Sequence, residues 1–392
     1  MRALVISSKS PFPVYDGAAI RTFQSIAFLN RMQYQVDVLY LSDNDNKAIV
    51  EKGLNTYCQN IYQFIISKKR SCINVIIGIM TNCLRLQVNY YMSKKAKRWI
   101  AHHQDNYNLV YCNNIRTAEY AKNIRTKKVL DYVDAFSMNY SSSKNKTKGL
   151  WHWIYTIDHY RCSKYEVNML NIFDKTMIIS DIDRRYILKS VIGIQPEISV
   201  IENFVRLDKD KIIDHNQDGC NIVFVGAMNY EPNVTAVTYF VKEVLPSIRK
   251  EYPKVVFYIV GKSPREEVKK LISDYIIVTG FVNDVWDYLQ KATVVVTPMR
   301  SGAGLQNKIL EALAVGACVV TSDIGFEGLK PAPGQPLVAR NTREMTKAIL
   351  TLLSDKDYRI SQSKLSLKYV AKYYSENVIF EKFKNALGEY SK

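Results

Sequence analysis

Short apolar runs alternate along the chain with longer segments in which apolar residues recur at helical spacing. Residues 3–7 and 36–41 are apolar runs of strand length, and residues 20–32 between them have the periodicity of a helix. A strand, a helix and a second strand in this order form a βαβ unit, which requires a parallel sheet with a right-handed crossover. The other strands predicted in the first half cover residues 109–112, 129–132, 175–180 and 198–202.

The alternation is interrupted twice. Apolar and basic segments alternate within residues 61–100, and we interpret this region as helices. The amphipathic parts of these helices could pack against the domain or lie on a membrane surface. Residues 207–219 are polar and are interpreted as a linker, after which the pattern restarts. Strands are then predicted at residues 221–225, 255–260, 276–279, 293–297 and 318–321.

The length of 392 residues exceeds what one hydrophobic core usually serves. We therefore expect an α/β protein with two doubly wound, Rossmann-like domains that face a cleft. The predicted boundaries are 1–206 for an N-terminal domain, 220–370 for a C-terminal domain and 371–392 for a terminal helix that crosses back to the first domain.

The strand at 293–297 leads into the most informative stretch, residues 297–324. Pro298 ends the strand, Gly302 and Gly304 form a loop, and apolar residues at helical spacing begin at Leu305. The free amides at the start of a helix that follows a glycine loop bind anions. This stretch therefore predicts an anion site.

Two charged residues, Lys308 and Glu311, lie on one face of the helix that follows. A cation near a helix start opposes the helix dipole, so Lys308 there indicates an anionic ligand. The carboxylate of Glu311, one turn further, can accept hydrogen bonds from sugar hydroxyls. The alternative is a solvated helix face, but the glycine loop favours a site for phosphate and ribose, which together indicate a nucleotide.

The N-terminal domain offers candidates at the carboxyl ends of its strands, where open α/β sheets bind ligands. Gly17 lies in the loop after the first strand and Arg21 in the helix that follows, although the loop has no G-x-G-x-x-G fingerprint. Asp131 and Asp134 follow the strand at 129–132. Two alternatives stay open here: Asp134 as a cap of the next segment, and Arg21 as a surface residue.

The composition indicates a cellular compartment and an uneven distribution of charge along the chain. The seven cysteines are scattered without paired spacing, which is typical of reduced thiols in a cytosolic protein. We identify neither a signal peptide nor an apolar run of membrane-spanning length. The net charge is +17, and residues 1–200 carry 28 Lys and Arg against 15 Asp and Glu. Such a domain attracts nucleic acid, an anionic membrane surface or an acidic substrate, unless the charge is only a solvated basic face.

The chain resembles the GT-B glycosyltransferases, specifically family 4 and within it the bacterial exopolysaccharide sugar transferases. The resemblance is strongest in three segments of the second half, residues 221–233, 279–285 and 297–328. In the first half it rests on Asp16-Gly17 and Arg21, on Asp131-Tyr-Val-Asp134 with Ser137, and on Tyr165-Glu166.

The family's familiar mark is a Glu-x7-Glu pair, and this chain departs from it. Glu311 matches the second Glu, which the family uses on the ribose hydroxyls, but Ala303 occupies the place of the first. The subgroup's pattern also lacks that Glu and shows instead residues that match Arg300, Gly304 and 306–308. The usual Arg and Lys of the loop after the first strand of this domain are absent too, and Met228 and Asn229 stand there.

The resemblance implies that the second domain binds a UDP- or GDP-linked sugar and the first domain binds the acceptor. The expected reaction is retaining, and fixed cations with helix-start amides hold the leaving diphosphate without a metal. We expect no other cofactor. Asp181 and Asp183 have the spacing of a metal motif, but Arg184 and Arg185 follow, which favours a helix cap.

These implications assign residues to roles. The expected catalytic residues are Asp134, which steers the acceptor hydroxyl or stabilises the donor sugar, with Arg300 and Lys308 on the diphosphate. The acceptor is expected near Gly17 and Arg21, and Phe281 lies in a loop expected against the nucleobase. The expected donor-binding residues are Asn229, Phe281, Gly302, Gly304, Leu305, Gln306, Asn307 and Glu311.

The sequence thus predicts a glycosyltransferase that extends a glycan or lipid-linked glycan of a surface polysaccharide, such as an exopolysaccharide or a lipopolysaccharide. It is expected in the cytoplasm, with peripheral contact between its basic first domain and the inner face of the membrane. Two alternatives remain: a GT-B relative of other chemistry, such as a sugar-nucleotide epimerase or a phosphorylase, and a basic nucleic-acid-binding protein. The latter requires basic residues interleaved with aromatics on one face, which the separated basic clusters lack.

Overall fold

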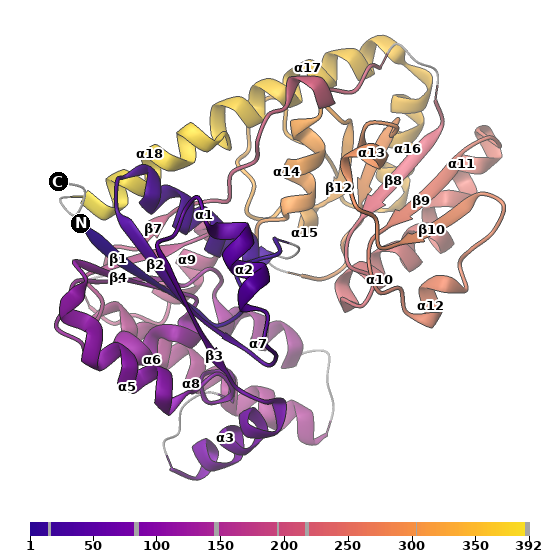
Figure 1. Ribbon diagram of the computed structural model, residues 1–392. Coiled ribbons are helices and arrows are strands. Elements are labelled where there is room, and N and C mark those ends of the chain that lie inside the picture. The colour runs from indigo at the N-terminus through magenta and orange to yellow at the C-terminus, as the bar shows by residue number, and fades with distance from the viewer. Residues whose placement is uncertain are drawn as a thin grey trace. The chain divides into compact units, whose positions relative to one another are not determined.

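The computed structural model describes residues 1–14, 17–81, 86–144, 149–193, 196–215, 219–302 and 304–388 (Figure 1). The chain divides into two compact units. Unit 1 comprises Met1–Asn203 with Phe380–Lys392, and unit 2 comprises Phe204–Ile379. Of the predicted linker, residues 216–218 lie outside the described part. In its described part, the imidazole of His215 makes a 2.9 Å hydrogen bond with the carbonyl of Gly316, inside unit 2.

Unit 1 contains a parallel sheet of seven strands within the described residues, in the order β3-β2-β1-β4-β5-β6-β7. The strands are β1 (Arg2–Ser7), β2 (Gln35–Ser42), β3 (Asn60–Ile65), β4 (Leu109–Asn113), β5 (Lys128–Asp131), β6 (Lys175–Ile178) and β7 (Ser199–Val200). The helices are α1 (Gly17–Arg31), α2 (Lys47–Leu54), α3 (Lys68–Thr81), α4 (Leu86–Tyr90), α5 (Lys94–His103), α6 (Ala118–Ala121), α7 (Phe136–Lys144), α8 (Leu150–Leu170) and α9 (Asp181–Leu188).

Unit 2 repeats the design with six described parallel strands in the order β10-β9-β8-β11-β12-β13. The strands are β8 (Asn221–Val225), β9 (Val256–Val260), β10 (Ile276–Gly280), β11 (Val294–Thr297), β12 (Val319–Ser322) and β13 (Leu337–Ala339). The helices are α10 (Glu231–Tyr239), α11 (Leu245–Glu251), α12 (Glu266–Lys269), α13 (Trp286–Leu289), α14 (Asn307–Ala314), α15 (Asp323–Phe326), α16 (Thr342–Ser354) and α17 (Lys356–Tyr373). The last helix, α18 (Glu376–Leu387), begins in unit 2 and continues into unit 1.

Both sheets are covered by helices on their two faces, as Figure 1 shows. Successive side chains of a strand point to opposite faces, yet Leu4 and Val5 of β1 are both buried, as are Val294 and Val295 of β11 in unit 2. Strands that are buried on both faces read as continuous apolar runs, which is why the sequence revealed most of them. The predicted α/β class with two doubly wound parallel sheets is confirmed.

The end of the chain returns to unit 1. Phe380 and Phe383 of α18 each lie 5.4 Å from the ring of Phe28 on α1, and Lys382 pairs with Glu202 at 2.8 Å. The predicted return of the terminal helix to the first domain is therefore confirmed, and these contacts fasten α18 to the face of the sheet that carries α1.

Some predicted elements were wrong. Residues 60–65 form strand β3 rather than a helix, because they pair with β2 along its whole length at the edge of the sheet. The predicted strand at 198–202 is reduced to β7. The helix predicted over 234–251 starts earlier, at Glu231, and contains a π-helical segment, Phe240–Val244. Pro246 lacks the amide proton that a continuous α-helix needs at this point, which accounts for the change in winding.

Candidate active site

Each sheet has one place where the strand order reverses, between β1 and β4 in unit 1 and between β8 and β11 in unit 2. In open α/β sheets, ligands bind at the carboxyl ends of the strands beside such a switch point. At each switch point, the last residue of one strand has a buried polar atom without a hydrogen-bond partner in the described part of the chain. These atoms are Nδ2 of Asn113 on β4 and Oγ1 of Thr297 on β11. Unsatisfied buried polar groups are uncommon in folded proteins and mark both switch points as candidate ligand sites.

In unit 2 the loop between β11 and α14 has the backbone shape that the sequence predicted. Gly302 and Gly304 have φ values of +124° and +75°, a region in which a side chain is strained, so glycine is required at both positions. Ser322 donates a hydrogen bond of 2.7 Å to the carbonyl of Met299 and fastens the loop to β12. Helix α14 begins at Asn307, two residues later than predicted, and the side chain of Gln306 does not cap it. Leu305 is buried in this loop, and Ala303 lies outside the described residues.

Lys308 projects from the first turn of α14 into the switch point. Its ammonium donates a 2.6 Å hydrogen bond to Oδ1 of Asn233 and lies 4.6 Å from the ring centroid of Phe224. Asn233 donates in turn to the carbonyl of Ala227 at 3.0 Å, so Lys308 is tied to the loop after β8. None of these partners is an anion. Burial lowers the pKa of Lys308 to about 7, although the charge of Glu311 opposes this.

Glu311 lies one turn further along α14 and is half-buried. Its carboxylate makes no hydrogen bond with the described residues, so its oxygens are available to a ligand. Burial raises the pKa of Glu311 to about 7, against the effect of the Lys308 charge. An ammonium and a carboxylate that are both poorly solvated and lack full partners are arranged for a ligand that is anionic at one end and hydroxylated at the other.

Three other predicted donor residues lie in loops at the carboxyl ends of strands of the same sheet. The exposed guanidinium of Arg300 lies 4.8 Å from the ring centroid of Tyr239. Phe281 is 57% exposed and follows Gly280 at the carboxyl end of β10. Asn229 lies in the loop after β8, where its carbonyl accepts a 2.8 Å hydrogen bond from Arg265.

Arg265 is a candidate that sequence reasoning missed. Besides Asn229, its guanidinium pairs with Glu231, so a cation stands beside the loop where Met228 and Asn229 replace the family's basic residues. The sequence contained a signal for this contact. A Cβ on Gly261, the residue after β9, would lie 1.9 Å from the carbonyl oxygen of Gly226, so the loops after β8 and β9 approach closely only because glycine stands there.

In unit 1 the structure places Arg21 in the core, only 1% exposed. Its guanidinium donates to both carboxylate oxygens of Asp131, at 2.6 and 3.2 Å, and to the carbonyl of Ile201 at 2.6 Å. Tyr111 donates to the same carboxylate at 2.7 Å. The surface alternative for Arg21 is therefore wrong, and its side chain is occupied inside the fold. Gly17, the other predicted acceptor residue, is exposed at the first position of α1, and Asp16 lies outside the described residues.

Asp131 and Asp183 together hold the turn that carries Asp134. Oδ1 of Asp131 accepts from the amide of Val133 at 3.0 Å, and Oδ1 of Asp183 accepts from the amide of Ala135 at 2.9 Å. Val133 has a φ of +65°, an outlier for a β-branched residue. Strained conformations that several hydrogen bonds enforce are concentrated at functional sites.

Asp134 is half-buried at the tip of this turn, and its carboxyl group makes no hydrogen bond with the described residues. The capping alternative is wrong, because the amide of Ser137 in the first turn of α7 donates to Glu166 instead. Burial and the charge of Asp183 raise the pKa of Asp134 to about 7, against the effect of Arg116.

The predicted cap of α9 is provided by Ser180. Among the described residues, no group of three or more His, Cys, Asp and Glu side chains is placed to hold a metal ion.

The buried Arg21–Asp131 pair makes a stability prediction. Removing one partner of a buried ion pair leaves the other charge uncompensated, so we expect Arg21→Met to lower the free energy of unfolding by about 3–5 kcal/mol. Urea denaturation followed by circular dichroism measures this. Adding Asp131→Asn removes the stranded charge and keeps an acceptor for Val133, so the double variant is expected to recover part of the loss. A loss below about 1 kcal/mol for the single variant would be that of an exposed pair and would contradict this account.

Comparisons with known proteins agree with this geometry. Residues 219–355 match the family model described as "Glycosyl transferases group 1". A curated "Uncharacterized 44.6 kDa protein in cps region" from Klebsiella pneumoniae is 25% identical over 359 residues, which cover 87% of each chain. Among solved structures, Anabaena HepE in complex with UDP and glucose aligns with a TM-score of 0.69 at 14% identity over 99% of both chains. A variant of TarM from S. aureus, solved with UDP, fondaparinux and alpha-GlcNAc-glycerol, aligns with a TM-score of 0.72 at 11% identity over 99% of this chain and 100% of that one.

Proposed function

We propose that the chain is a glycosyltransferase that transfers a sugar from UDP or GDP to a glycan or lipid-linked glycan of a surface polysaccharide. It has the GT-B fold, and its residues 219–355 match the group 1 glycosyl transferase model. The observation that carries the proposal is the half-buried Lys308 at the switch point of unit 2, whose amine has no anionic hydrogen-bond partner among the described residues. Further support comes from the UDP in the HepE and TarM structures and from the cps region of the Klebsiella relative.

In this proposal, unit 2 holds the nucleotide end of the donor. Lys308, Arg300 and the amides of the loop around Gly302 bear the charge of the diphosphate as the bond between the sugar and the phosphate oxygen breaks. Glu311 accepts hydrogen bonds from the ribose hydroxyls. We propose that these fixed charges serve in place of a metal ion, and activity that is unchanged in a chelator is the expected result.

Unit 1 supplies the acceptor side of the proposed reaction. The acceptor hydroxyl oxygen forms the new bond to the anomeric carbon, and Asp134 orients that hydroxyl or stabilises positive charge on the donor sugar. We propose that the anomeric configuration is retained, as the resemblance implies. The coupling constant of the anomeric proton in the initial product, measured by NMR, distinguishes retention from inversion.

A nucleotide panel tests the proposal. The chain is titrated with UDP, GDP and short oligonucleotides while its melting temperature is followed, and donor hydrolysis is screened with sugar derivatives of both nucleotides. A ligand that binds only the folded state stabilises it by RT ln(1 + [L]/Kd), where [L] is the free ligand concentration. UDP or GDP is therefore expected to raise the melting temperature. A rise with oligonucleotides alone would overturn the proposal in favour of nucleic-acid binding. A sugar phosphate that forms with orthophosphate would favour a phosphorylase, and an epimerised sugar product would favour an epimerase.

We also propose that the enzyme works at an anionic membrane surface. No helix in the described ranges is both long and apolar enough to cross a bilayer. Helix α3 nevertheless exposes apolar side chains, with Ile76 at 60% and Ile73 at 45% exposure, and begins with Lys68, Lys69 and Arg70. Exposed apolar residues beside a basic cluster are the combination that binds anionic lipid headgroups.

Replacing Ile73 and Ile76 with serine tests this surface. The double variant is expected to bind vesicles of phosphatidylglycerol and phosphatidylcholine at least about 100-fold more weakly in a co-sedimentation assay, because each Ile loses about 1.5–3 kcal/mol of burial and about 1.4 kcal/mol corresponds to a tenfold change in affinity. Ile192→Ser is the matched control, since Ile192 is fully exposed elsewhere in unit 1. Equal vesicle binding by all three proteins would rule out α3 as the contact, and an absence of binding by the parent chain would rule out membrane association.

A further inference from the structure

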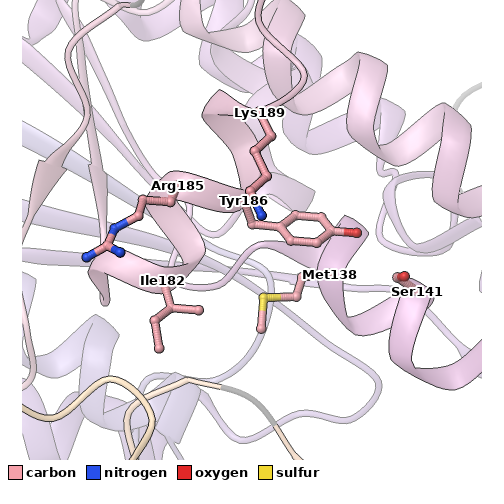
Figure 2. Close-up of a pocket in the computed structure, with 6 residues that line it drawn as sticks. All are labelled: Met138, Ser141, Ile182, Arg185, Tyr186 and Lys189. Atoms are coloured by element: carbon pink, nitrogen blue, oxygen red, sulfur yellow. The ribbon is translucent and has the colours of Figure 1, made fainter.

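A pocket in unit 1 lies between α7 and α9 and has a volume of about 500 Å³. Figure 2 shows the side chains that line it. The ring of Tyr186 extends from α9 with its hydroxyl on the side of Ser141, and the guanidinium of Arg185 lies at the opposite end of the lining. Among the described residues, the lining consists of Met138, Ser141, Ile182, Arg185, Tyr186 and Lys189. Nothing in the function proposed above uses these residues.

The pocket lies next to the turn of Asp134. Helix α7 starts two residues after Asp134, and α9 is joined to the same turn by the hydrogen bond between Asp183 and the amide of Ala135. At the rise of about 1.5 Å per residue, Tyr186 and Lys189 stand roughly 5 and 9 Å along α9 from Asp183. A saccharide with a hydroxyl at Asp134 would therefore place its neighbouring group in the pocket.

The lining combines an apolar wall with cations. The ring of Tyr186 and the thioether of Met138 offer surfaces suited to the apolar face of a sugar, and the hydroxyl of Ser141 offers a hydrogen bond. Lys189 is exposed and pairs with no acid among the described residues. Arg185 shares the carboxylate of Asp181 with Arg184, so two guanidinium groups face one negative charge. The cations at this pocket are thus not balanced by the fold.

We propose that the pocket is an acceptor subsite that binds an anionic group, a phosphate or a carboxylate, attached to the acceptor saccharide. Arg185 and Lys189 pair with the anion, and Tyr186 and Met138 contact the sugar ring. The inference rests on the proposed function, because it assigns acceptor binding to unit 1, and it adds the chemical class of the acceptor. It also gives the basic charge of this part of unit 1 a specific ligand.

Binding of small probes tests the subsite apart from catalysis. Glucose 1-phosphate, glucuronic acid and methyl glucoside are titrated into the full chain with UDP present, which fills the nucleotide site, and again without UDP. Isothermal calorimetry measures the affinities. The Arg185→Gln/Lys189→Gln double variant is expected to bind the anionic probes at least about tenfold more weakly, the value of roughly one charge-assisted contact. Its affinity for UDP and for the neutral glucoside is expected to stay unchanged.

Lys94→Gln/Lys95→Gln is the matched control, because it removes the same charge from exposed positions of unit 1 on α5. Weaker binding of glucose 1-phosphate alone would identify a phosphate-linked acceptor, and weaker binding of glucuronic acid alone would identify an acidic sugar. Equal losses in the two double variants, or equal binding of methyl glucoside and the anions, would overturn the subsite. If the subsite is overturned but UDP binding is unaltered, the proposed function is still supported. If the probes bind but UDP does not, only the donor site is contradicted.

Discussion

Lys308→Met is expected to lower kcat/KM by about 10²–10³-fold, the usual effect of removing one group that stabilises charge in a transition state. Among the described residues, the ammonium of Lys308 has only neutral hydrogen-bond and ring partners, namely Asn233, the sulfur of Met299 and the ring of Phe224. An anion beside it gains a large interaction energy because little water screens the pair. Methionine keeps most of the side-chain volume, so the loss reports the charge rather than a cavity.

The pKa of Lys308 adds a second signature. Burial lowers this pKa to about 7, so a fraction of the free enzyme carries a neutral amine at neutral pH. A bound diphosphate favours the ammonium form and raises the pKa, so nucleotide binding takes up a proton. Affinity for UDP or GDP is therefore expected to fall as the pH rises above about 7, whereas an ordinary lysine would keep it constant up to about pH 10.

Calorimetry in two buffers of different ionisation enthalpy measures the proton uptake directly. The parent chain is expected to take up a proton on binding at about pH 8, and Lys308→Met is expected to show neither the uptake nor the loss of affinity with pH. Lys347→Met is a suitable control, since Lys347 is exposed on α16 of the same unit. Nucleotide binding by Lys308→Met at parental affinity would remove Lys308 from the site.

Lys308 and Glu311 could be found from the sequence because their relation is local. Two residues three positions apart on a helix share a face, and the glycines before them predict a loop. Neither inference depends on the rest of the chain. Asn233 and Arg265 could not be found in this way. Their contacts with Lys308 and with the loop after β8 depend on the order of the strands, which brings together segments that are far apart in the chain.

The same distinction separates the fold that was predicted from the part that was missed. Strands that are buried on both faces are apolar runs in the sequence and were predicted for that reason. Their alternation with helices indicated the α/β fold class. Strand β3 lies at the edge of its sheet and mixes polar and apolar residues, so its pairing with β2 decided its conformation against the sequence signal. Arg21 likewise reads as a surface residue until Asp131, 110 positions away, is placed beside it.

Asp134 gives the second large effect. We expect Asp134→Asn to lower kcat by about 10²–10⁴-fold, the range for a carboxylate that accepts a proton from, or stabilises charge on, a reacting group. The amide occupies the same volume and cannot ionise, and it leaves unchanged the hydrogen bonds that the amides of Val133 and Ala135 donate to Asp131 and Asp183. The binding of UDP or GDP is expected to be unaffected, because Asp134 belongs to unit 1.

The elevated pKa of Asp134 makes a test that separates catalysis from stability. Activity at saturating donor is expected to rise with pH through about 7, as the carboxyl ionises. Because Asp183 contributes to the rise in pKa, Asp183→Asn is expected to move this limb to lower pH while keeping an acceptor for the amide of Ala135. A limb that stays in place in Asp183→Asn would assign the titration to another group.

Stability is expected to change in the opposite direction to activity. A carboxyl whose pKa is raised by folding stabilises the folded state only while it is protonated, and this contribution is lost as the pH rises through the folded pKa of about 7. At about pH 8 the ionised Asp134 therefore destabilises unit 1, and Asp134→Asn is expected to raise the melting temperature there, with little change near about pH 4. An inactive variant that is more stable than its parent cannot owe its inactivity to unfolding, so this pair of measurements assigns Asp134 to the reaction itself. A melting temperature that falls at both pH values would instead make Asp134 a structural residue of the turn.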